Sequence, residues 1–279
     1  MKNRINKKSV IILGSIILCI IIIFGLIYSI KILNEKNLEK LRKETEEKEN
    51  NLGEYELLEK NFDDIFLNDI KNAENISEEI KKVKESKKIV YTKYQGDKKK
   101  ENKYTVNVKI PYININNKLA SKYNKEIEEI FVEKLKKVMT EAKNEIYTVE
   151  YTSNIQENIL SIVIKSTLKQ EGGTQRIIIK TYCFDIKEES EIKLQDILKN
   201  KKINEEEVQD KIIQKIKEKQ NEALALEQLG YEIYTRDYTD KLYQIKNITD
   251  FYMDENGYIY IIFAYGNNNS TGEMDIIII

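Results

Sequence analysis

The longest apolar run of the chain lies close to its N-terminus. No charged residue occurs from Ser9 to Ile30. As a helix with a rise of about 1.5 Å per residue, this run spans about 33 Å, enough to cross a hydrocarbon core of about 30 Å. Four basic residues and no acid precede it: Lys2, Arg4, Lys7 and Lys8. By the positive-inside rule, we expect a cytoplasmic tail over 1–8, one transmembrane anchor over 9–31 and an extracellular remainder.

Two other N-terminal signals fit this segment less well. A cleaved signal peptide has an apolar core of about 7–15 residues and a small-x-small cleavage site. The run here is longer, and no such site follows Tyr28. A lipoprotein signal would place Gly or Ala before the modified cysteine, whereas Leu18 precedes Cys19. An uncleaved anchor is therefore the prediction.

A helical stalk and connector are predicted next, over 32–103. Oppositely charged residues between Leu38 and Glu47 recur at (i, i+4) spacing, which suits a solvated helix. Apolar residues then follow helical spacing from Glu54 to Lys84. This second stretch is amphipathic and can pack on the domain behind it or on a partner.

From Tyr104 the pattern becomes that of a compact α+β domain, over 104–279. Tyr104 to Ile110 alternates with period two and predicts a strand that ends at Pro111. Apolar residues at helical spacing predict two long helices, near 118–143 and 204–228. Further strands are predicted over 146–155, 158–168, 174–186, a hairpin at 251–263 and 274–279. We expect an antiparallel sheet with two covering helices, large enough to fold without metal or disulfide.

Composition excludes several functions. The formal net charge is −1, whereas a nucleic-acid binder is expected to carry a basic patch. Histidine is absent from the sequence, so the chain lacks Ser-His-Asp and Cys-His pairs and the usual zinc ligands. Asp254 to Gly257 lacks the spacing of a calcium loop and predicts a hairpin turn. Cys183 alternates with aromatic residues and predicts a buried structural thiol. We expect neither an enzyme nor a cofactor nor a metal site.

Two segments are candidates for ligand binding. Four tyrosines crowd 231–243, a segment without regular pattern, and tyrosine offers a large contact area at small entropic cost. A polar loop follows Tyr265 between apolar strands, and such loops on rigid scaffolds often carry function. Packing over the second helix, for the tyrosines, and a plain connector, for the loop, are the structural alternatives. The candidate ligand-binding residues are Tyr234, Tyr238, Tyr265, Asn267, Asn268, Asn269 and Ser270.

Three groups of motifs follow one another in 104–279: Val106–Ile115 with Tyr123–Ile127, then Ile192–Leu198, then Phe251–Tyr265. In this order they resemble the extracytoplasmic domain of RsiV-like proteins. RsiV-like proteins are lysozyme-sensing anti-sigma factors of Gram-positive bacteria, and the same domain precedes some peptidoglycan deacetylases. The resemblance implies a cell-wall glycan or a muramidase-like protein as ligand. We expect no anti-sigma activity, because a tail of eight residues extends at most about 28 Å and buries little.

The function expected from these observations is that of a membrane-anchored extracytoplasmic binding or sensing domain for a cell-wall-associated ligand. A bitopic structural or assembly protein of the cell envelope, acting through its helical stalk, is the alternative. A wall hydrolase with a carboxylate pair is a third possibility, since carboxylates are abundant.

Overall fold

The computed structural model describes residues 53–66, 81–82 and 88–279. The expected tail and anchor, and the first part of the expected stalk, lie outside the described residues. In the described part, no helix combines the length and the apolar character needed to cross a bilayer. The chain divides into two compact units, Met1–Leu57 and Leu58–Ile279. Of the first unit, only the start of helix α2 (Glu54–Lys60) and the residue before it are described.

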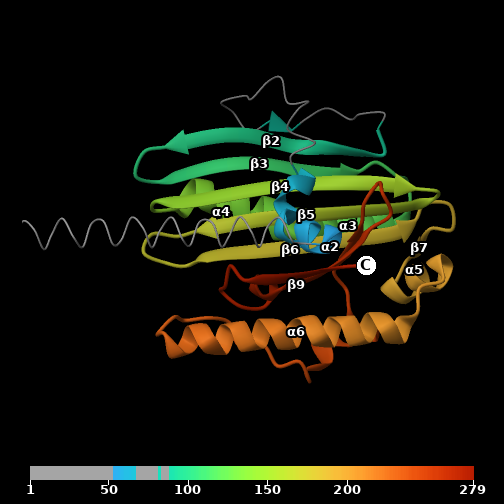
Figure 1. Ribbon diagram of the computed structural model, residues 1–279. Helices are drawn as coiled ribbons and strands as arrows, with labels where there is room; N and C mark the ends of the chain where they lie inside the picture. Colours follow the sequence, from blue (N-terminus) through green and yellow to red (C-terminus); the bar gives the residue numbers. More distant parts are fainter. Residues whose placement is uncertain (1–52, 67–80, 83–87) are drawn as a thin grey trace, which may run out of the picture. The chain divides into compact units, whose positions relative to one another are not determined.

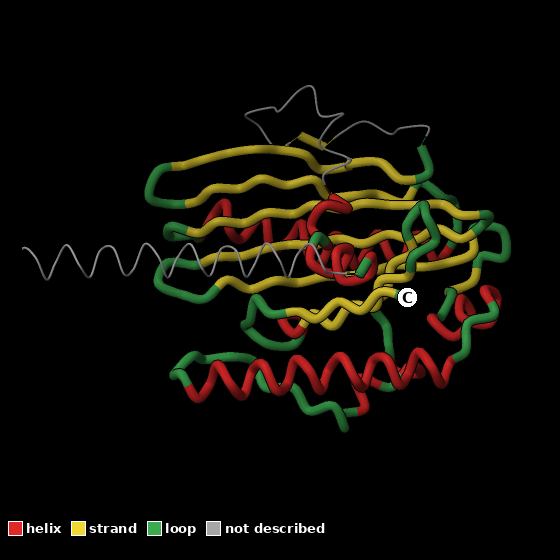
Figure 2. The backbone as a smooth tube through the Cα atoms, viewed as in Figure 1, coloured by secondary structure: helices red, strands yellow, loops and turns green. Residues whose placement is uncertain are grey.

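The second unit contains two β-sheets (Figures 1 and 2). In sheet A seven strands follow one another in chain order: β1 (Lys81–Lys82), β2 (Val90–Lys100), β3 (Tyr104–Ile113), β4 (Glu145–Gln156), β5 (Ile159–Lys169), β6 (Gln175–Asp185) and β7 (Ser190–Glu191). In sheet B the strand order is β10-β9-β8: β8 (Phe251–Met253), β9 (Ile259–Ala264) and β10 (Met274–Ile278). The α+β class is confirmed, but the strands form two sheets where one was expected.

A helical crossover makes one strand pair of sheet A parallel. The predicted first helix joins β3 to β4 as α3 (Lys118–Ile127), a π-helical turn (Glu128–Val132) and α4 (Glu133–Glu141). β3 and β4 are therefore parallel, whereas the other described pairs of sheet A are antiparallel. Parallel neighbours need such a crossover, and a helix that packs on the sheet supplies it.

β3 continues through Pro111, where the pattern had predicted its end. The register of β2 against β3 shifts at Lys93, beside the partner of Pro111. Proline has no N–H to donate, and a bulge in the neighbouring strand accommodates the missing ladder bond. β2 itself lies inside 32–103, so the sheet begins before Tyr104. Its polar second half, Gly96 to Lys100, hides the strand pattern.

The core is layered. One face of sheet A packs under α3 and α4, and the other packs against sheet B. The far face of sheet B packs on α5 (Leu194–Lys201) and α6 (Glu205–Gln228). The unbroken apolar sequence of β9 follows from burial on both faces, with Tyr260 toward sheet A and Ile261 toward the helices. The two predicted helices thus cover different sheets.

Part of the predicted amphipathic stretch packs on the same domain. Phe62 and Phe66 join the cluster that fills the space between the two sheets. Lys165 of β5 is buried beneath this segment and donates a hydrogen bond to Asp63 at 2.6 Å. A buried ammonium needs such a partner. The amphipathic stretch was expected to pack either on the domain behind it or on a partner. Residues 58–66 pack on the domain.

Candidate functional site

The loop between β9 and β10 lies along the outer edge of β6. Three alternating N–H groups of β6 donate to acceptors outside sheet A: Ile177 to the Thr271 carbonyl (3.0 Å), Ile179 to Asn267 Oδ1 (3.0 Å) and Thr181 to Asp250 Oδ1 (3.2 Å). An open strand edge is a template for unwanted pairing with other chains. The loop and the residue before β8 therefore protect this edge.

Two glycines bring the loop close to β6. A Cβ at Gly266 would lie 1.7 Å from the carbonyl oxygen of Ile177, and one at Gly272 would lie 2.6 Å from that of Gln175. Arg176 Nε also donates to the Gly266 carbonyl at 2.8 Å. Only a residue without a side chain fits such an approach. Part of the polar loop thus has a structural role.

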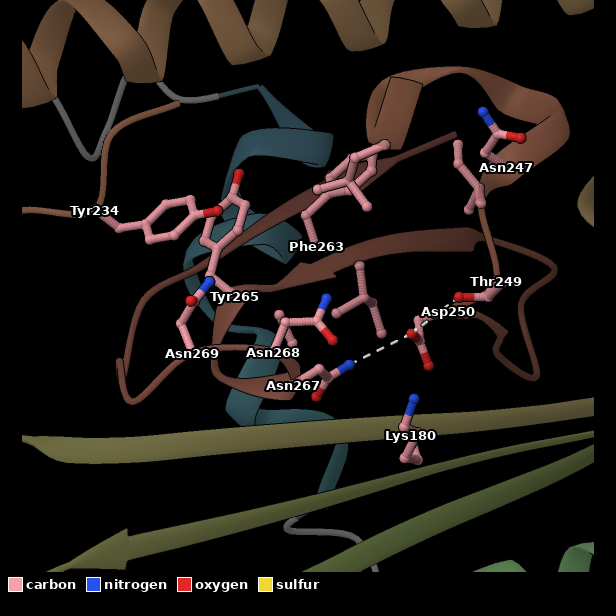
Figure 3. A pocket seen from close by; sticks show the side chains of 14 residues that line it. Lys180, Tyr234, Asn247, Thr249, Asp250, Phe263, Tyr265, Asn267, Asn268 and Asn269 are labelled. Carbon is pink, nitrogen blue, oxygen red and sulfur yellow. Dashed lines mark hydrogen bonds between the residues drawn. The ribbon is translucent and has the colours of Figure 1, made fainter. Parts of the chain in front are cut away.

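A cavity of about 180 Å³, here called the amide pocket, opens between this loop and the segment that leads into β8 (Figure 3). Its walls include Phe263 and the rings of Tyr234 and Tyr265, and its polar lining is Lys180, Asn247, Thr249, Asp250, Asn267, Asn268 and Asn269. The side chains of Asn268 and Asn269 are exposed. Each amide offers two donors and an acceptor, and apolar walls with a few polar groups are typical of small-ligand sites.

Asp250 joins the pocket to the edge of β6. Besides the Thr181 N–H, its carboxylate accepts from the Thr249 hydroxyl at 3.2 Å and from Asn267 Nδ2 at 3.4 Å. Burial raises the pKa of this carboxyl, although the nearby Lys180 and the hydrogen bonds act in the opposite direction. Asp250 therefore ionises at higher pH than an exposed aspartate does.

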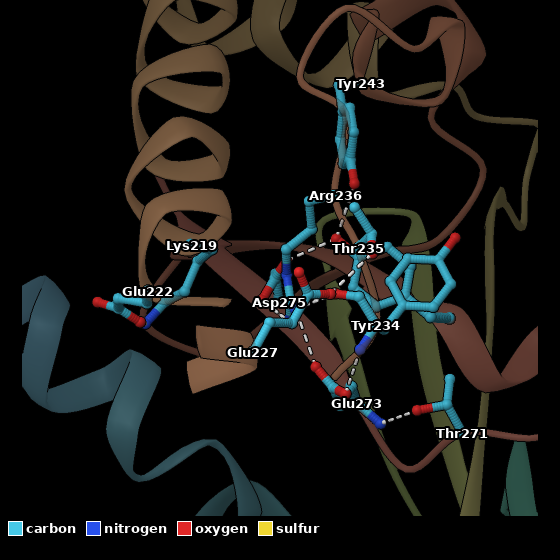
Figure 4. Close-up of polar contacts among 11 residues, drawn as sticks. Lys219, Glu222, Glu227, Tyr234, Thr235, Arg236, Tyr243, Thr271, Glu273 and Asp275 are labelled. Atoms are coloured by element: carbon cyan, nitrogen blue, oxygen red, sulfur yellow. Dashed lines mark hydrogen bonds and ion pairs between the residues drawn. The ribbon is translucent and has the colours of Figure 1, made fainter. Parts of the chain in front are cut away.

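A buried ion pair supports the aromatic wall of the pocket (Figure 4). Arg236 donates to both carboxylate oxygens of Asp275, at 2.8 and 3.0 Å, and to Glu273 at 2.8 Å. The Tyr265 hydroxyl donates to Asp275 at 2.5 Å, and the Tyr234 ring stacks on the Tyr265 ring with centroids 4.1 Å apart. Burial and then Asp275 raise the pKa of Tyr265, which keeps this phenol a donor. Charge-assisted bonds of this kind fix both rings.

Five of the seven candidate residues line the amide pocket: Tyr234, Tyr265, Asn267, Asn268 and Asn269. The other two do not. Ser270 is exposed further along the loop, where its carbonyl oxygen accepts from the Thr174 hydroxyl at 3.5 Å. Tyr238 packs against the cluster between sheet B and the helices, with the Lys217 ammonium 4.5 Å from its ring centroid.

The sequence pattern missed the part of the pocket that comes from elsewhere in the chain. Lys180 belongs to β6, while Asn247, Thr249 and Asp250 precede β8. No local pattern marks these residues, because only the docking of the loop on β6 brings them to Tyr265. The only local sign of these pocket residues was the polar pair Thr249-Asp250 directly before the apolar strand β8.

Two smaller predictions are confirmed. Cys183 is a buried free thiol, and burial raises its pKa to about 12. Asp254 forms a turn, in which its Oδ1 accepts from the N–H groups of Asn256 and Tyr258, both at 2.9 Å. Within the described ranges, no three side chains of His, Cys, Asp or Glu are grouped so that they could hold a metal ion.

No family model matches the sequence, and no curated protein matches it. Two solved structures of DUF3298 family proteins are similar in part. One, from Pseudomonas aeruginosa PAO1, is 12% identical over 35% of this chain and 50% of its own, with a TM-score of 0.28. The other, from Bacteroides fragilis NCTC 9343, is 15% identical over 63% of this chain and 80% of its own, with a TM-score of 0.29.

The structural neighbours are thus DUF3298 proteins, which contain a domain of unknown function. The chain spans about half the length of the first of them. Neither match points to RsiV-like proteins or to deacetylases specifically.

Proposed function

We propose that the chain is a membrane-anchored extracytoplasmic binding or sensing domain of the RsiV-like kind, without catalytic activity. Its ligand is a cell-wall glycan, and the amide pocket receives it. The N-terminal uncharged run with basic residues before it supports the anchor and its orientation.

The observation that carries the proposal is the set of groups that meet at the amide pocket. Exposed amides of Asn268 and Asn269 stand beside the half-buried ring of Tyr234. Sugar hydroxyl and acetamido groups are both donors and acceptors, which side-chain amides can match on both counts. The apolar face of a sugar ring packs on an aromatic side chain such as Tyr234, whose own position is fixed by Tyr265.

The dimensions of the pocket favour a glycan over a muramidase-like protein as its occupant. A stable protein partner buries about 800 Å² of each surface. A cavity of about 180 Å³ instead suits one sugar unit or an acetamido group. The alternative of an assembly protein that acts through its stalk is weakened by residues 58–66, whose Phe62 and Phe66 are buried within their own domain.

A titration calorimetry experiment tests the assignment. The full-length chain in detergent micelles is titrated with soluble peptidoglycan fragments and, separately, with lysozyme. We expect the fragments to bind and the double variant Asn268→Ala/Asn269→Ala to weaken binding about tenfold, the effect of losing one or two hydrogen bonds. Ser270→Ala is the matched control, because Ser270 lies in the same loop outside the pocket.

The possible results separate the alternatives. No detectable binding of either the peptidoglycan fragments or lysozyme would contradict a wall-binding function. Binding that the double variant leaves unchanged would contradict the pocket. Lysozyme binding that the double variant abolishes would instead favour the muramidase-like ligand.

A further inference from the structure

A second cavity, of about 380 Å³, shares Lys180, Thr249 and Asp250 with the amide pocket. We call it the phenol pocket. It is formed by α3 with the π-helical turn that follows it, by β6, by Glu191 at the end of β7 with Ile192 after it, and by the residues from Thr249 to the start of β8. Its lining is chemically different, because it combines two tyrosines with four carboxylates and two lysines.

Tyr182 is the unusual group of this cavity. Its side chain lines the pocket and is 4% exposed, and its hydroxyl has no hydrogen-bond partner. Other buried phenols of the domain are bonded: that of Tyr147 donates to the Phe131 carbonyl at 3.2 Å, and that of Tyr243 lies 2.9 Å from the Tyr265 hydroxyl. A buried polar group without a partner is costly, so its presence calls for an explanation such as a bound molecule.

The surroundings of Tyr182 are aromatic and acidic. The Tyr123 ring packs against it with centroids 4.7 Å apart. Carboxylates outnumber ammonium groups in the lining, with Glu126, Glu129, Glu191 and Asp250 against Lys122 and Lys180. Beyond the effect of burial, Glu191 and Glu126 raise the pKa of Tyr123, while Glu126 and Asp250 raise that of Tyr182. Both hydroxyls therefore lie in a negative potential, which disfavours an anionic ligand.

The lysines offset only part of this charge. The Lys122 ammonium lies 3.8 Å from Glu126, and the Lys125 ammonium lies 3.5 Å from Glu129. Both are exposed (i, i+4) pairs that solvent screens, and Lys180 lies near Asp250. The carboxylates are also not grouped to chelate a metal, since the described residues hold no cluster of three suitable side chains. An organic cation is the remaining class that matches the negative charge.

We propose that the phenol pocket binds the primary ammonium group of a small organic molecule, with the Tyr182 hydroxyl as acceptor and Glu126 as counter-charge. An ammonium carries three donors and can serve the phenol and a carboxylate together. The rings of Tyr123 and Tyr182 provide the π surfaces on which cations are stabilised. This site does not depend on which ligand the amide pocket takes.

Saturation-transfer NMR and calorimetry on the full-length chain in micelles test the proposal. Butylammonium is the probe, while 1-butanol and butyrate are its neutral and anionic counterparts of similar size. Saturable binding of butylammonium, about tenfold or more tighter than that of 1-butanol, is expected. Tyr182→Phe and Glu126→Gln are each expected to weaken it about fivefold or more.

Matched controls make the same chemical changes outside the pocket: Tyr147→Phe on the same face of sheet A and Glu133→Gln on α4. Both should leave binding unchanged. Tyr182→Phe should not lower the midpoint of chemical unfolding, because the hydroxyl it removes has no partner. A separate arm compares glucosamine with Nα-acetyl-lysinamide, and the tighter binder identifies an amino sugar or a peptide side chain as the source of the ammonium.

Three results would overturn the proposal. The first is no saturable binding by any of the three ammonium compounds. The second is equal affinity for butylammonium and 1-butanol. The third is an equal effect of Tyr182→Phe and Tyr147→Phe.

Discussion

The guanidinium of Arg236 and the carboxylate of Asp275 form a bidentate ion pair in which neither residue is more than 6% exposed. Asp275 also accepts a hydrogen bond from the Tyr265 hydroxyl, and the Tyr234 ring stacks on the Tyr265 ring. The pair therefore sets the position of the aromatic wall of the amide pocket. Arg236 lies among the irregular residues after α6, so its ion pair with Asp275 attaches this segment to strand β10.

Replacing Arg236 by Leu should destabilise the protein strongly. Removal of one partner leaves Asp275 as a buried charge without compensation, and such losses are about 3–5 kcal/mol. The free energy of unfolding in urea measures the effect. Lys136→Ala is the control, because it breaks an exposed pair with Glu133, and it should change stability little. Similar losses in the two variants would show that the buried pair is not a main support of the domain.

Gly266→Ala should be among the most damaging substitutions in the loop. Its Cβ would lie 1.7 Å from the Ile177 carbonyl oxygen, so the loop must leave the edge of β6. We expect a loss of about 3 kcal/mol in unfolding free energy. At Gly173, in the β5–β6 turn, the nearest atoms would be 3.7 Å away, and Ala there should change stability by about 0.5 kcal/mol or less. A tolerated Gly266→Ala would mean that the loop does not contact β6 this closely.

Two adjacent asparagines of the loop should differ in their effect on stability. Asn267→Ala leaves the Ile179 N–H without its acceptor and should cost about 1–2 kcal/mol of stability. Asn268→Ala changes an exposed side chain and should cost about 0.5 kcal/mol or less. Thermal and urea unfolding of the two variants provide the comparison. The reverse order of losses would remove Asn267 from its role at the strand edge.

The thiol of Cys183 should resist alkylation in the native protein. Burial raises its pKa from 9.0 to about 12, so the reactive thiolate is scarce at pH 9. This raised pKa also means that its contribution to stability is present below pH 9 and is lost as the pH rises toward about 12.

Iodoacetamide labelling, followed by mass spectrometry in a Cys19→Ser background, measures this reactivity. We expect slow labelling at pH 9 in buffer and rapid labelling in guanidinium chloride. Rapid labelling of the folded protein would show that the Cys183 thiol is accessible to reagents through the phenol pocket, which this residue also lines.

Local signals were sufficient for the long periodic elements. The helix predicted over 204–228 is observed over Glu205–Gln228, and the Asn204 side chain accepts the Glu206 N–H at 2.9 Å as an N-cap. The strand β2 was missed because Gly96 and the following lysines do not alternate. The pattern predicted a strand end at Pro111, because the bulge that accommodates this proline lies in β2 and leaves no mark in the sequence around Pro111. Partner strands are invisible to a local pattern.

The candidate site was predictable to the extent that it is local. Tyr234, Tyr265 and the three asparagines stood out by composition, and the pocket brings them together. Lys180 and Asp250 could not be found, because they reach the pocket through the docking of the loop on β6. The orphan hydroxyl of Tyr182 was equally hidden, since the alternation of β6 marks that residue only as a core position.

Hydrogen-exchange mass spectrometry of the full-length chain, with and without soluble peptidoglycan fragments, tests the central claim most directly. Slower exchange is predicted in peptides that cover 247–250 and 265–270, with α4 unchanged as an internal reference. Protection confined to other parts of the chain, under conditions where calorimetry detects binding, would contradict the amide pocket as the ligand site.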